Sequence, residues 1–440
     1  MNKETYGKLL KIKSEMEGFM NQSVPFWLEN GVDSEYGGYL VCFDADGKPM
    51  KELAVLSPDD KMIVTQTRMI WGFSALLRNK IADRFGWSEA CRAAAAQGVD
   101  FFIDKFWDKK HLGWAWVTDR KGNVLDNGKL VYGQTFAIYA LSEYYMATGD
   151  AKGLEYAEKT FDVLKKYAVD SMYGGYFENL REDWTLEDAG VYGGDLKSLD
   201  IHMHAMEAYT ALYEATHKEI HERALREVIH IILTHMVDYD YWCGRNQFSI
   251  DFTPKPAISI RRTWNYDRDP QSANRNPLDT TSYGHNIELV WLLNRAYEVL
   301  GEPPAREFTK KFADYTIANG WDYRYGGIYR DGMHDGRLVV SDKEWWQNFE
   351  SLTGFLDSYE TTGDDRYLDK FMELWEFDKK YFYNRETGES RQLLKEDGTP
   401  VIPDTGNQWK CIYHTDRAMM ECSLRIEKIQ NRMQKEDERM

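Results

Sequence analysis

Four of the ten histidines stand in or beside the starts of apolar helical stretches, where an imidazole could transfer protons. They are His202 and His204 in LDIHMHAME, His285 in SYGHNIE and His414 in WKCIYHTDRA. Because an imidazole ordinarily titrates near pH 6.5, it can both accept and donate a proton at neutral pH. Two imidazoles on opposite sides of a substrate could remove a proton from one face of a carbon and return it to the other, which inverts that centre. Such a carbon must be acidic, hence next to a carbonyl, as C2 of an open-chain aldose is.

The spacing of these groups on a helix decides which of them can act together. His202 and His204 are two positions apart and point in different directions, so we expect only one of them to face the middle of the fold. Positions three apart share a face, which would place a ring or an amide beside a carboxylate. Three stretches repeat that spacing: His204 with Glu207, His285 with Glu288, and Gln347 with Glu350.

Metal binding and a purely structural role are the alternatives to acid–base chemistry. Carboxylate-bridged metal pairs use Glu-x-x-His, whereas the order here is reversed, so we predict no metal site. Each glutamate could instead satisfy buried polar groups in the core, and this interpretation stays open for any one of the three. The sequence shows no Gly-rich loop that would cradle phosphates, and we predict that no cofactor is needed.

Cationic and aromatic side chains accompany the histidines. Arg68 lies near the start of the first apolar stretch, where it could hold the oxyanion of an enediolate or form a structural ion pair. Tyrosine and tryptophan offer flat apolar faces for sugar C–H groups together with a polar edge. The cluster favours a carbohydrate ligand, and its members are Tyr132, Trp345, Trp346 and Trp409.

Six apolar stretches carry these residues: 65–77, 132–150, 201–216, 283–301, 345–364 and 413–429. Marker residues within them are 66, 70, 81, 62 and 67 positions apart, which is room for two helices and their connections. The markers are Arg68, Gln134, His204, His285, Gln347 and His414. We predict an all-α, (α/α)6 barrel in which these helices form an inner ring, amphipathic helices surround it, and the polar helix starts line one end. A protein-binding α-solenoid is the alternative.

The connections between the helices and the amino-acid composition allow further predictions about domain limits, partners and localisation. Gly-containing turns at 35–40, 111–116, 172–179 and 324–331 predict short extended segments. We expect a single barrel domain over residues 1–430 and a charged tail over 431–440. The net charge of −17 disfavours nucleic acid and anionic membrane as partners. Five cysteines without CxxC spacing and an N-terminus unlike a signal peptide suggest a cytoplasmic protein.

Several strings resemble those of the N-acylglucosamine 2-epimerase family, and among its members the cellobiose and mannose 2-epimerases most. They are DIHMHAMEAYTALYEA, SYGHNIELVWLL, KEWWQNFE and WKCIYHTDRAMME, and the resemblance runs from about Trp27 to about Ile429. It implies a six-hairpin α/α barrel that epimerises C2 of a reducing sugar through an enediolate. It implies that His285 and His414 are the catalytic histidines and that His204 assists ring opening. The positions that match sugar contacts are Arg68, Tyr132, Glu288, Trp346 and Trp409.

Some positions depart from the family pattern without removing a proton-transfer group. Asn286 stands in place of Asp in GHDIE and Asn348 in place of Gln in WWxQxE, which bears on the subsite contacts. Thr415 and Met419 depart from YHNxRACxE. Asp200, where several relatives carry Asn, would add a charge close to the second histidine of HxH, and we count it among the substrate-binding candidates.

The long step before His285 bears on the choice of sugar. Segment 244–281 is too rich in Pro and Arg to be a core helix, and it could form a lid over the mouth of the barrel or an ordinary surface excursion. A lid would leave room for one sugar ring, so we expect D-mannose and D-glucose as substrates, with cellobiose or mannobiose as the alternative.

Other functions fit the same scaffold. An aldose–ketose isomerase such as a mannose isomerase returns the proton to C1, for which one histidine suffices, whereas the presence of both His285 and His414 favours an epimerase. A glycoside hydrolase would need two carboxylates set across a bond. A protein-binding role is a further class. We expect a small-molecule sugar as the partner, and the sequence leaves the oligomeric state open.

Overall fold

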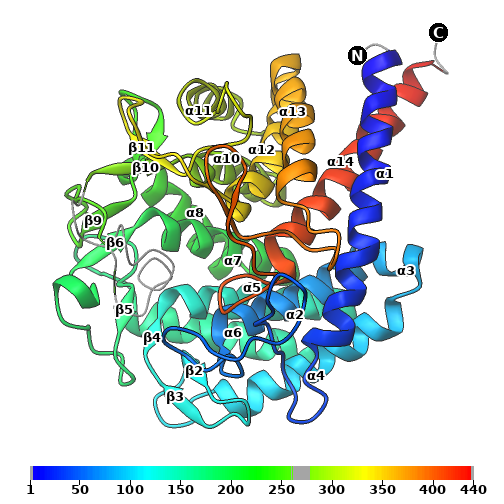
Figure 1. Ribbon diagram of the computed structural model, residues 1–440. Coiled ribbons are helices and arrows are strands. Elements are labelled where there is room, and N and C mark those ends of the chain that lie inside the picture. The colour runs from blue at the N-terminus through cyan, green and yellow to red at the C-terminus, as the bar shows by residue number, and fades with distance from the viewer. Residues whose placement is uncertain (1–2, 259, 261–277, 438–440) are drawn as a thin grey trace.

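The computed structural model describes residues 3–258, 260 and 278–437, and it is mostly helical (Figure 1). The predicted helical fold class is confirmed. Apolar helices lie in the interior, and amphipathic helices cover them from outside. Within the described ranges, no helix combines the length and the apolar character needed to cross a membrane.

The inner helices pack side by side in a closed series. Each contacts the next along the chain, and the last contacts the first. They begin within two residues of the predicted stretches: α2 (Ile63–Arg78), α5 (Val131–Thr148), α7 (Leu199–Thr216), α10 (Tyr283–Leu300), α12 (Trp345–Thr362) and α14 (Ile412–Asp437). Helix α14 continues into the segment expected to be a tail. Burial extends around the whole helix, as in α12, where every residue from Trp345 to Ser358 is buried.

Each inner helix has an outer partner. Helix α4 packs on α2, α6 on α5, α8 on α7, α11 on α10, α13 on α12, and α1 on α14, beside which it runs in Figure 1. In α8 the buried Leu225, Val228, Ile229 and Ile232 recur every three or four residues, which gives one apolar stripe. The outer helices are α1 (Lys3–Phe26), α4 (Ser88–Phe106), α6 (Ala151–Tyr167), α8 (Glu219–His235), α11 (Arg306–Asn319) and α13 (Asp365–Tyr381). The short helices are η1 (Trp27–Gly31), α3 (Ile81–Phe85) and η2 (Gly190–Tyr192).

Short antiparallel strands lead directly into α2, α5, α7, α10 and α12 and so fix where those helices begin. These leading strands are β1 (Lys61–Met62), β4 (Lys129–Leu130), β6 (Leu196–Ser198), β10 (Thr280–Ser282) and β13 (Lys343–Glu344). Their sheets are completed by β2 (Val117–Thr118), β3 (Val124–Asp126), β5 (Asn179–Leu180), β9 (Gln247–Ser249), β11 (Asp331–Met333), β12 (Leu338–Val340), β14 (Leu393–Leu394) and β15 (Pro400–Ile402). Strands β7 (Val237–Asp238) and β8 (Cys243–Gly244) pair with each other.

The glycine turns carry the short extended segments expected of them, and one polar side chain from an inner helix holds each turn. In the first turn, Tyr39 pairs with Val32, and Gln66 accepts from the Tyr39 amide at 2.9 Å and donates to its carbonyl at 2.9 Å. The corresponding acceptors for other turns are Gln134, His202, Asn286 and Asn348. These hydrogen bonds therefore fix the inner helices along their axes relative to the turns. Asn286 and Asn348 take part in them.

A buried ion pair recurs at the same place in four of the repeats. A lysine of the leading strand reaches an aspartate that follows the preceding outer helix, as Lys61 does to Asp33 at 2.9 Å with both side chains buried. The same aspartate accepts backbone N–H groups of the turn, including that of Tyr36 at 3.3 Å. The other pairs are Lys129–Asp108, Lys197–Asp170 and Lys343–Asp322. Each pair ties the end of an outer helix to the start of the next inner helix.

Ion pairs also join the inner helices towards their other ends. Arg78 of α2 contacts Glu143 of α5 at 2.9 Å and Glu214 of α7 at 2.6 Å, and Arg295 of α10 contacts the same Glu214 at 2.6 Å. Arg425 of α14 contacts Asp357 of α12 at 2.9 Å. These ion pairs hold the inner helices together away from the helix starts, which carry the residues predicted to form the site.

Candidate active site at the starts of the inner helices

The predicted site residues lie in the first two turns of the inner helices. His285 and His414 are the third residues of their helices, Tyr132 and Trp346 the second, and Arg68 and His204 the sixth. Because these residues stand at the starts of inner helices that pack side by side, their side chains converge at one end of the helical ring. Trp409 lies just before α14 and joins them.

His204 is held between two carboxylates. Its Nδ1 lies 2.8 Å from Glu207 Oε2, as the spacing of three residues predicts, and its Nε2 lies 3.3 Å from Asp200 Oδ1. Burial by itself lowers the pKa of His204, but the hydrogen bonds and charges of Asp200 and Glu207 outweigh it and raise the pKa to about 10. His204 is therefore an imidazolium at neutral pH and suits the role of a proton donor.

Asp200 also connects His204 with the second predicted histidine. The same Asp200 oxygen, Oδ1, lies 3.4 Å from Nε2 of His285. The charge that this residue adds to the site thus acts on two imidazoles, one from α7 and one from α10. From the sequence we expect Asp200 to lie near His204 only.

His285 and His414 lie against the same indole. The ring centroid of Trp346 is 4.5 Å from that of His285 and 5.9 Å from that of His414. Trp346 is itself fixed, because its Nε1 donates to Glu344 Oε2 at 3.0 Å. Two imidazoles from α10 and α14 are therefore brought to one place, although 129 residues separate them.

His414 is oriented by a buried glutamate. Its Nδ1 lies 2.7 Å from Oε1 of Glu350 on α12, so Nε2 is the ring nitrogen turned away from that carboxyl group. Burial raises the pKa of Glu350 to about 8, although the charge of Arg417 opposes this rise. The sequence had placed Glu350 beside Gln347, whereas Gln347 donates to the hydroxyl of Ser282 at 2.9 Å.

Arg417 is the main site-forming residue that sequence reasoning missed. Its buried guanidinium donates through Nη1 to Glu207, and through Nη2 to Glu288 at 2.8 Å and to Glu350 at 2.6 Å. Glu288 therefore lies against Arg417, where a side-by-side arrangement with His285 was predicted. A signal was available, because Arg417 stands three residues after His414 and so shares a helix face with it.

The same carboxylates could in principle hold a metal ion. Ligand atoms of Glu288, Glu350 and His414 lie within 4.8 Å of one another. The guanidinium of Arg417 hydrogen-bonds to both of these glutamates, however, and so already supplies the cation that balances them. The donor set is thus better described as an arginine site than as a metal site.

Arg68, Tyr132 and Trp409 form the opposite side of the cluster. Arg68 donates to the Tyr132 hydroxyl at 3.0 Å and to the Trp409 carbonyl at 3.0 Å, and its guanidinium lies 4.5 Å from the ring centre of Phe136. The Tyr132 ring is 5.4 Å from that of His204. Among the described atoms, buried Nε of Arg68 has no hydrogen-bond acceptor.

His202 and His204 diverge as helical geometry predicts. The backbone N–H of Tyr176 donates to Nε2 of His202 at 3.1 Å, and Nδ1 of His202 lies 2.9 Å from the Ser198 carbonyl oxygen. A Cβ on Gly175 would come within 2.6 Å of His202 Nε2, so glycine is required there. His202 supports the fold, and only His204 reaches the site.

The proposed lid falls partly outside the described residues. Within segment 244–281, residues 259 and 261–277 are not described. At its edges, β9 pairs with β6, which leads into α7 and His204, and β10 leads into α10 and His285. Both ends of the segment are therefore anchored next to the site.

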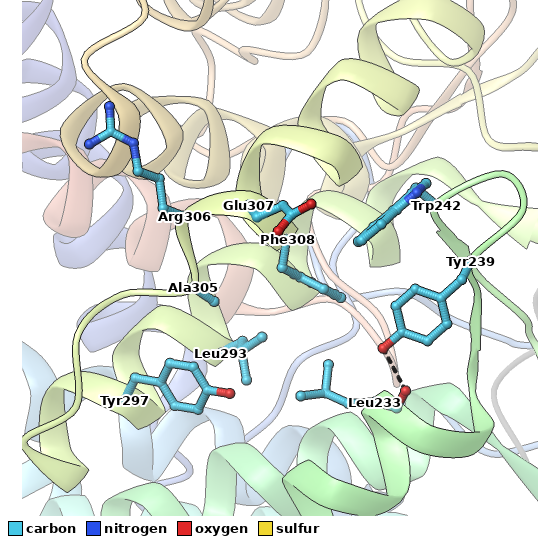
Figure 2. Close-up of a pocket in the computed structure, with 9 residues that line it drawn as sticks. All are labelled: Leu233, Tyr239, Trp242, Leu293, Tyr297, Ala305, Arg306, Glu307 and Phe308. Carbon is cyan, nitrogen blue, oxygen red and sulfur yellow. Dashed lines mark hydrogen bonds between the residues drawn. The ribbon is translucent and has the colours of Figure 1, made fainter.

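A separate pocket lies on the outside of the ring. It has a volume of about 400 Å³ and is lined by residues of α8, α10 and α11. Figure 2 shows the aromatic rings around it. The hydroxyl of Tyr239 donates there to the Leu233 carbonyl at 2.6 Å. None of the histidines lines this pocket, so it is distinct from the candidate active site.

Comparisons with known proteins agree with these observations. A sequence model described as N-acylglucosamine 2-epimerase (GlcNAc 2-epimerase) matches residues 37–418. Cellobiose 2-epimerase of Bacteroides fragilis is 28% identical over 93% of this chain and 98% of its own length, and that of Dictyoglomus turgidum is 29% identical over 94% and 99%. The structure of cellobiose 2-epimerase from Spirochaeta thermophila superposes with a TM-score of 0.80 at 29% identity, covering 96% of this chain and 98% of that one.

Proposed function

This chain belongs to the N-acylglucosamine 2-epimerase family, and from that premise and the site geometry we propose that it is a sugar isomerase that inverts C2 of a reducing sugar. The observation that carries the proposal is the placement of His285 and His414 against the single indole of Trp346. Inversion by proton transfer requires two groups on one carbon, each able to accept and to donate a proton near neutral pH.

The reaction proceeds through an enediolate. One imidazole removes the C2 proton of the open-chain aldose, the C–H electron pair forms a C1–C2 double bond, and the C1 carbonyl oxygen becomes anionic. The other histidine, as imidazolium, then donates its proton to the opposite face of C2 while the carbonyl re-forms. One proton leaves and one returns, so no oxidant, reductant or cofactor is consumed. We assign these two roles to His285 and His414.

His204 and Arg68 supply the charge that the reaction needs. A substrate sugar is mostly a closed ring, and ring opening requires a proton at the ring oxygen. The raised pKa of His204 supports its role as that donor. To Arg68 we assign the stabilisation of the enediolate oxygen, and the helix starts add the positive ends of their dipoles. We assign sugar contacts to Tyr132, Asp200, Glu288, Trp346 and Trp409.

We further propose that residues 1–430 form one (α/α)6-barrel domain. The contact of α14 with α2 supports a closed barrel, because it joins the two ends of the inner series. The pairing of each inner helix with an outer helix supports the hairpin as the repeating unit. In such a barrel, the site lies at the end where the inner helices start.

D-mannose and D-glucose are the first candidate substrates. The step of 81 residues between His204 and His285 supports this choice, because the additional chain is inserted next to the site and would restrict it to one ring. Cellobiose is the second candidate, and the names of the two curated relatives favour it. Both candidates undergo the same chemistry at the reducing end.

Incubation in heavy water tests the function directly. D-mannose, D-glucose and cellobiose are each incubated with the protein in D2O, and the products are followed by NMR. We expect the C2 epimer to form with deuterium at C2, because histidine protons exchange with solvent. Deuterium at C1 with formation of fructose from mannose would show an aldose–ketose isomerase, and the absence of any conversion of the three sugars would contradict the proposal.

A further inference from the structure

One guanidinium connects the two histidine–glutamate pairs of the site. Arg417 contacts Glu207, which holds Nδ1 of His204, and Glu350, which holds Nδ1 of His414. The arginine side chain is 1% exposed, and the glutamates are similarly buried. The two imidazoles, from α7 and α14, thus share one cation.

The buried charges do not balance without this arginine. Three carboxyl groups surround it in a region from which water is excluded, where an unpaired carboxylate takes up a proton rather than stay charged. Glu207 shows the effect: burial acts to raise its pKa, but the charge of Arg417, followed by His204, brings the pKa below the ordinary value. The groups that face this cluster are Glu207, Glu288, Glu350, His204, His414, Tyr413 and, across the Tyr413 ring, Arg68.

The hydrogen bond at Oε1 of Glu350 decides which nitrogen of His414 can act as a base. Arg417 donates to this oxygen through Nε at 3.1 Å and through Nη2 at 2.6 Å, so a proton taken up by Glu350 lies on Oε2 and Oε1 still accepts. The neutral His414 ring must then carry its proton on Nδ1, and the lone pair is left on Nε2. Without Arg417, a proton on Oε1 would be donated to Nδ1, and the ring proton would lie on Nε2. In that tautomer Nε2 cannot accept a proton from a substrate.

We propose that Arg417 is a positioning residue that keeps Glu207 as a carboxylate and Oε1 of Glu350 as a hydrogen-bond acceptor, and thereby holds His204 as an imidazolium and His414 in the Nδ1–H tautomer. The inference rests on the proposed epimerisation for its catalytic consequence. Its structural content, the protonation of two imidazoles, can be measured without any substrate.

The experiment compares the histidine tautomers in Arg417→Gln, Arg417→Lys and the unaltered enzyme. Uniformly 15N-labelled histidine is incorporated, and ring nitrogen shifts are recorded by NMR from pH 6 to 10, with signals assigned through His204→Gln and His414→Gln. Arg425→Gln is the matched control, because Arg425 is also buried on α14 and contacts Asp357 and Glu360 but neither histidine.

In the unaltered enzyme we expect neutral His414 to carry its proton on Nδ1. In Arg417→Gln we expect the proton to move to Nε2, the His204 pKa to fall, and kcat to drop by about 100-fold or more, since a correctly placed general base contributes about 10²–10⁴-fold. Arg417→Lys restores the positive charge and should partly recover the Nδ1–H tautomer, the His204 pKa and kcat. Arg425→Gln should lose thermal stability but keep the His414 tautomer and the pH profile.

Two results would overturn the inference. The first is an Nε2–H tautomer of His414 in the unaltered enzyme, which needs no variant to fold. The second is a folded Arg417→Gln protein, checked by circular dichroism, with unchanged histidine signals. If the tautomer shifts as expected but the unaltered enzyme converts no sugar, the proposed function fails while the assignment of Arg417 stands.

Discussion

Replacing Asp200 by Asn tests how the site keeps His204 protonated. Burial lowers the pKa of His204, yet Asp200 and Glu207 raise it to about 10. Compared with the ordinary value of 6.5, this favours the imidazolium by about 5 kcal/mol. Asp200 and Glu207 together produce this rise in the His204 pKa and also offset the lowering by burial. Loss of one carboxylate therefore removes about half of the rise or more. We therefore expect the His204 pKa to fall by about 2 pH units or more in the variant.

The same pKa makes a prediction about stability. A histidine whose folded pKa lies above its unfolded value stabilises the fold fully below pH 6.5, and this contribution is lost as the pH rises to about 10. The free energy of unfolding of the native protein should thus fall by about 5 kcal/mol more over this range than that of His204→Gln, which lacks the group. In Asp200→Asn the corresponding fall in the free energy of unfolding should be about half as large or smaller.

Two measurements check this reasoning. NMR titration of 13C-labelled histidine gives the pKa of His204 in both proteins, and urea unfolding at pH 6.5, 8 and 10 gives the stability difference. The alkaline limb of kcat/KM should move to lower pH in Asp200→Asn, because the proton donor is lost earlier. A His204 pKa that is the same with Asp and with Asn at position 200 would refute the assignment of Asp200 as a source of the shift.

Three further predictions concern the bases, the framework and metals. His285→Asn and His414→Asn should each lower kcat by about 100-fold or more with the fold intact by circular dichroism, and a variant that keeps the native rate would contradict the two-base scheme. Lys343→Met leaves the buried carboxylate of Asp322 without its cation and should cost about 3–5 kcal/mol in urea unfolding, whereas the same change at exposed Lys48 should cost under about 1 kcal/mol. Added EDTA should leave the rate unchanged, because a buried arginine balances the carboxylates; loss of activity that zinc or manganese restores would overturn this.

The helical organisation could be predicted from local pattern. Apolar residues on every face of 345–364 indicate a buried helix whatever the rest of the chain does, and α12 indeed begins at Trp345. The divergence of His202 from His204 likewise follows from helical geometry alone. The contact of His204 with Glu207 is a third example, because both residues lie on one face of the same helix.

The partners of other site residues could not be read from the same spacing. His285 and Glu288 are also three apart, yet Glu288 lies against Arg417, 129 residues later. Asn286 and Asn348 depart from the family motifs and were expected to bear on the subsite contacts, whereas their side chains accept hydrogen bonds from the backbone N–H groups of Gly244 and Ile328. In each case a partner from another helix decides where the side chain lies.

The sequence by itself therefore determined the helices, their repeat and the face on which each polar group stands, because these depend on the apolar pattern within about twenty neighbouring residues. Only the tertiary structure decided which groups meet. The pair His414–Glu350, the shared oxygen of Asp200 and the cluster around Arg417 each join helices that are far apart in the chain. Their protonation depends on burial and on the charges of these distant partners, and both arise only when the inner helices have packed together.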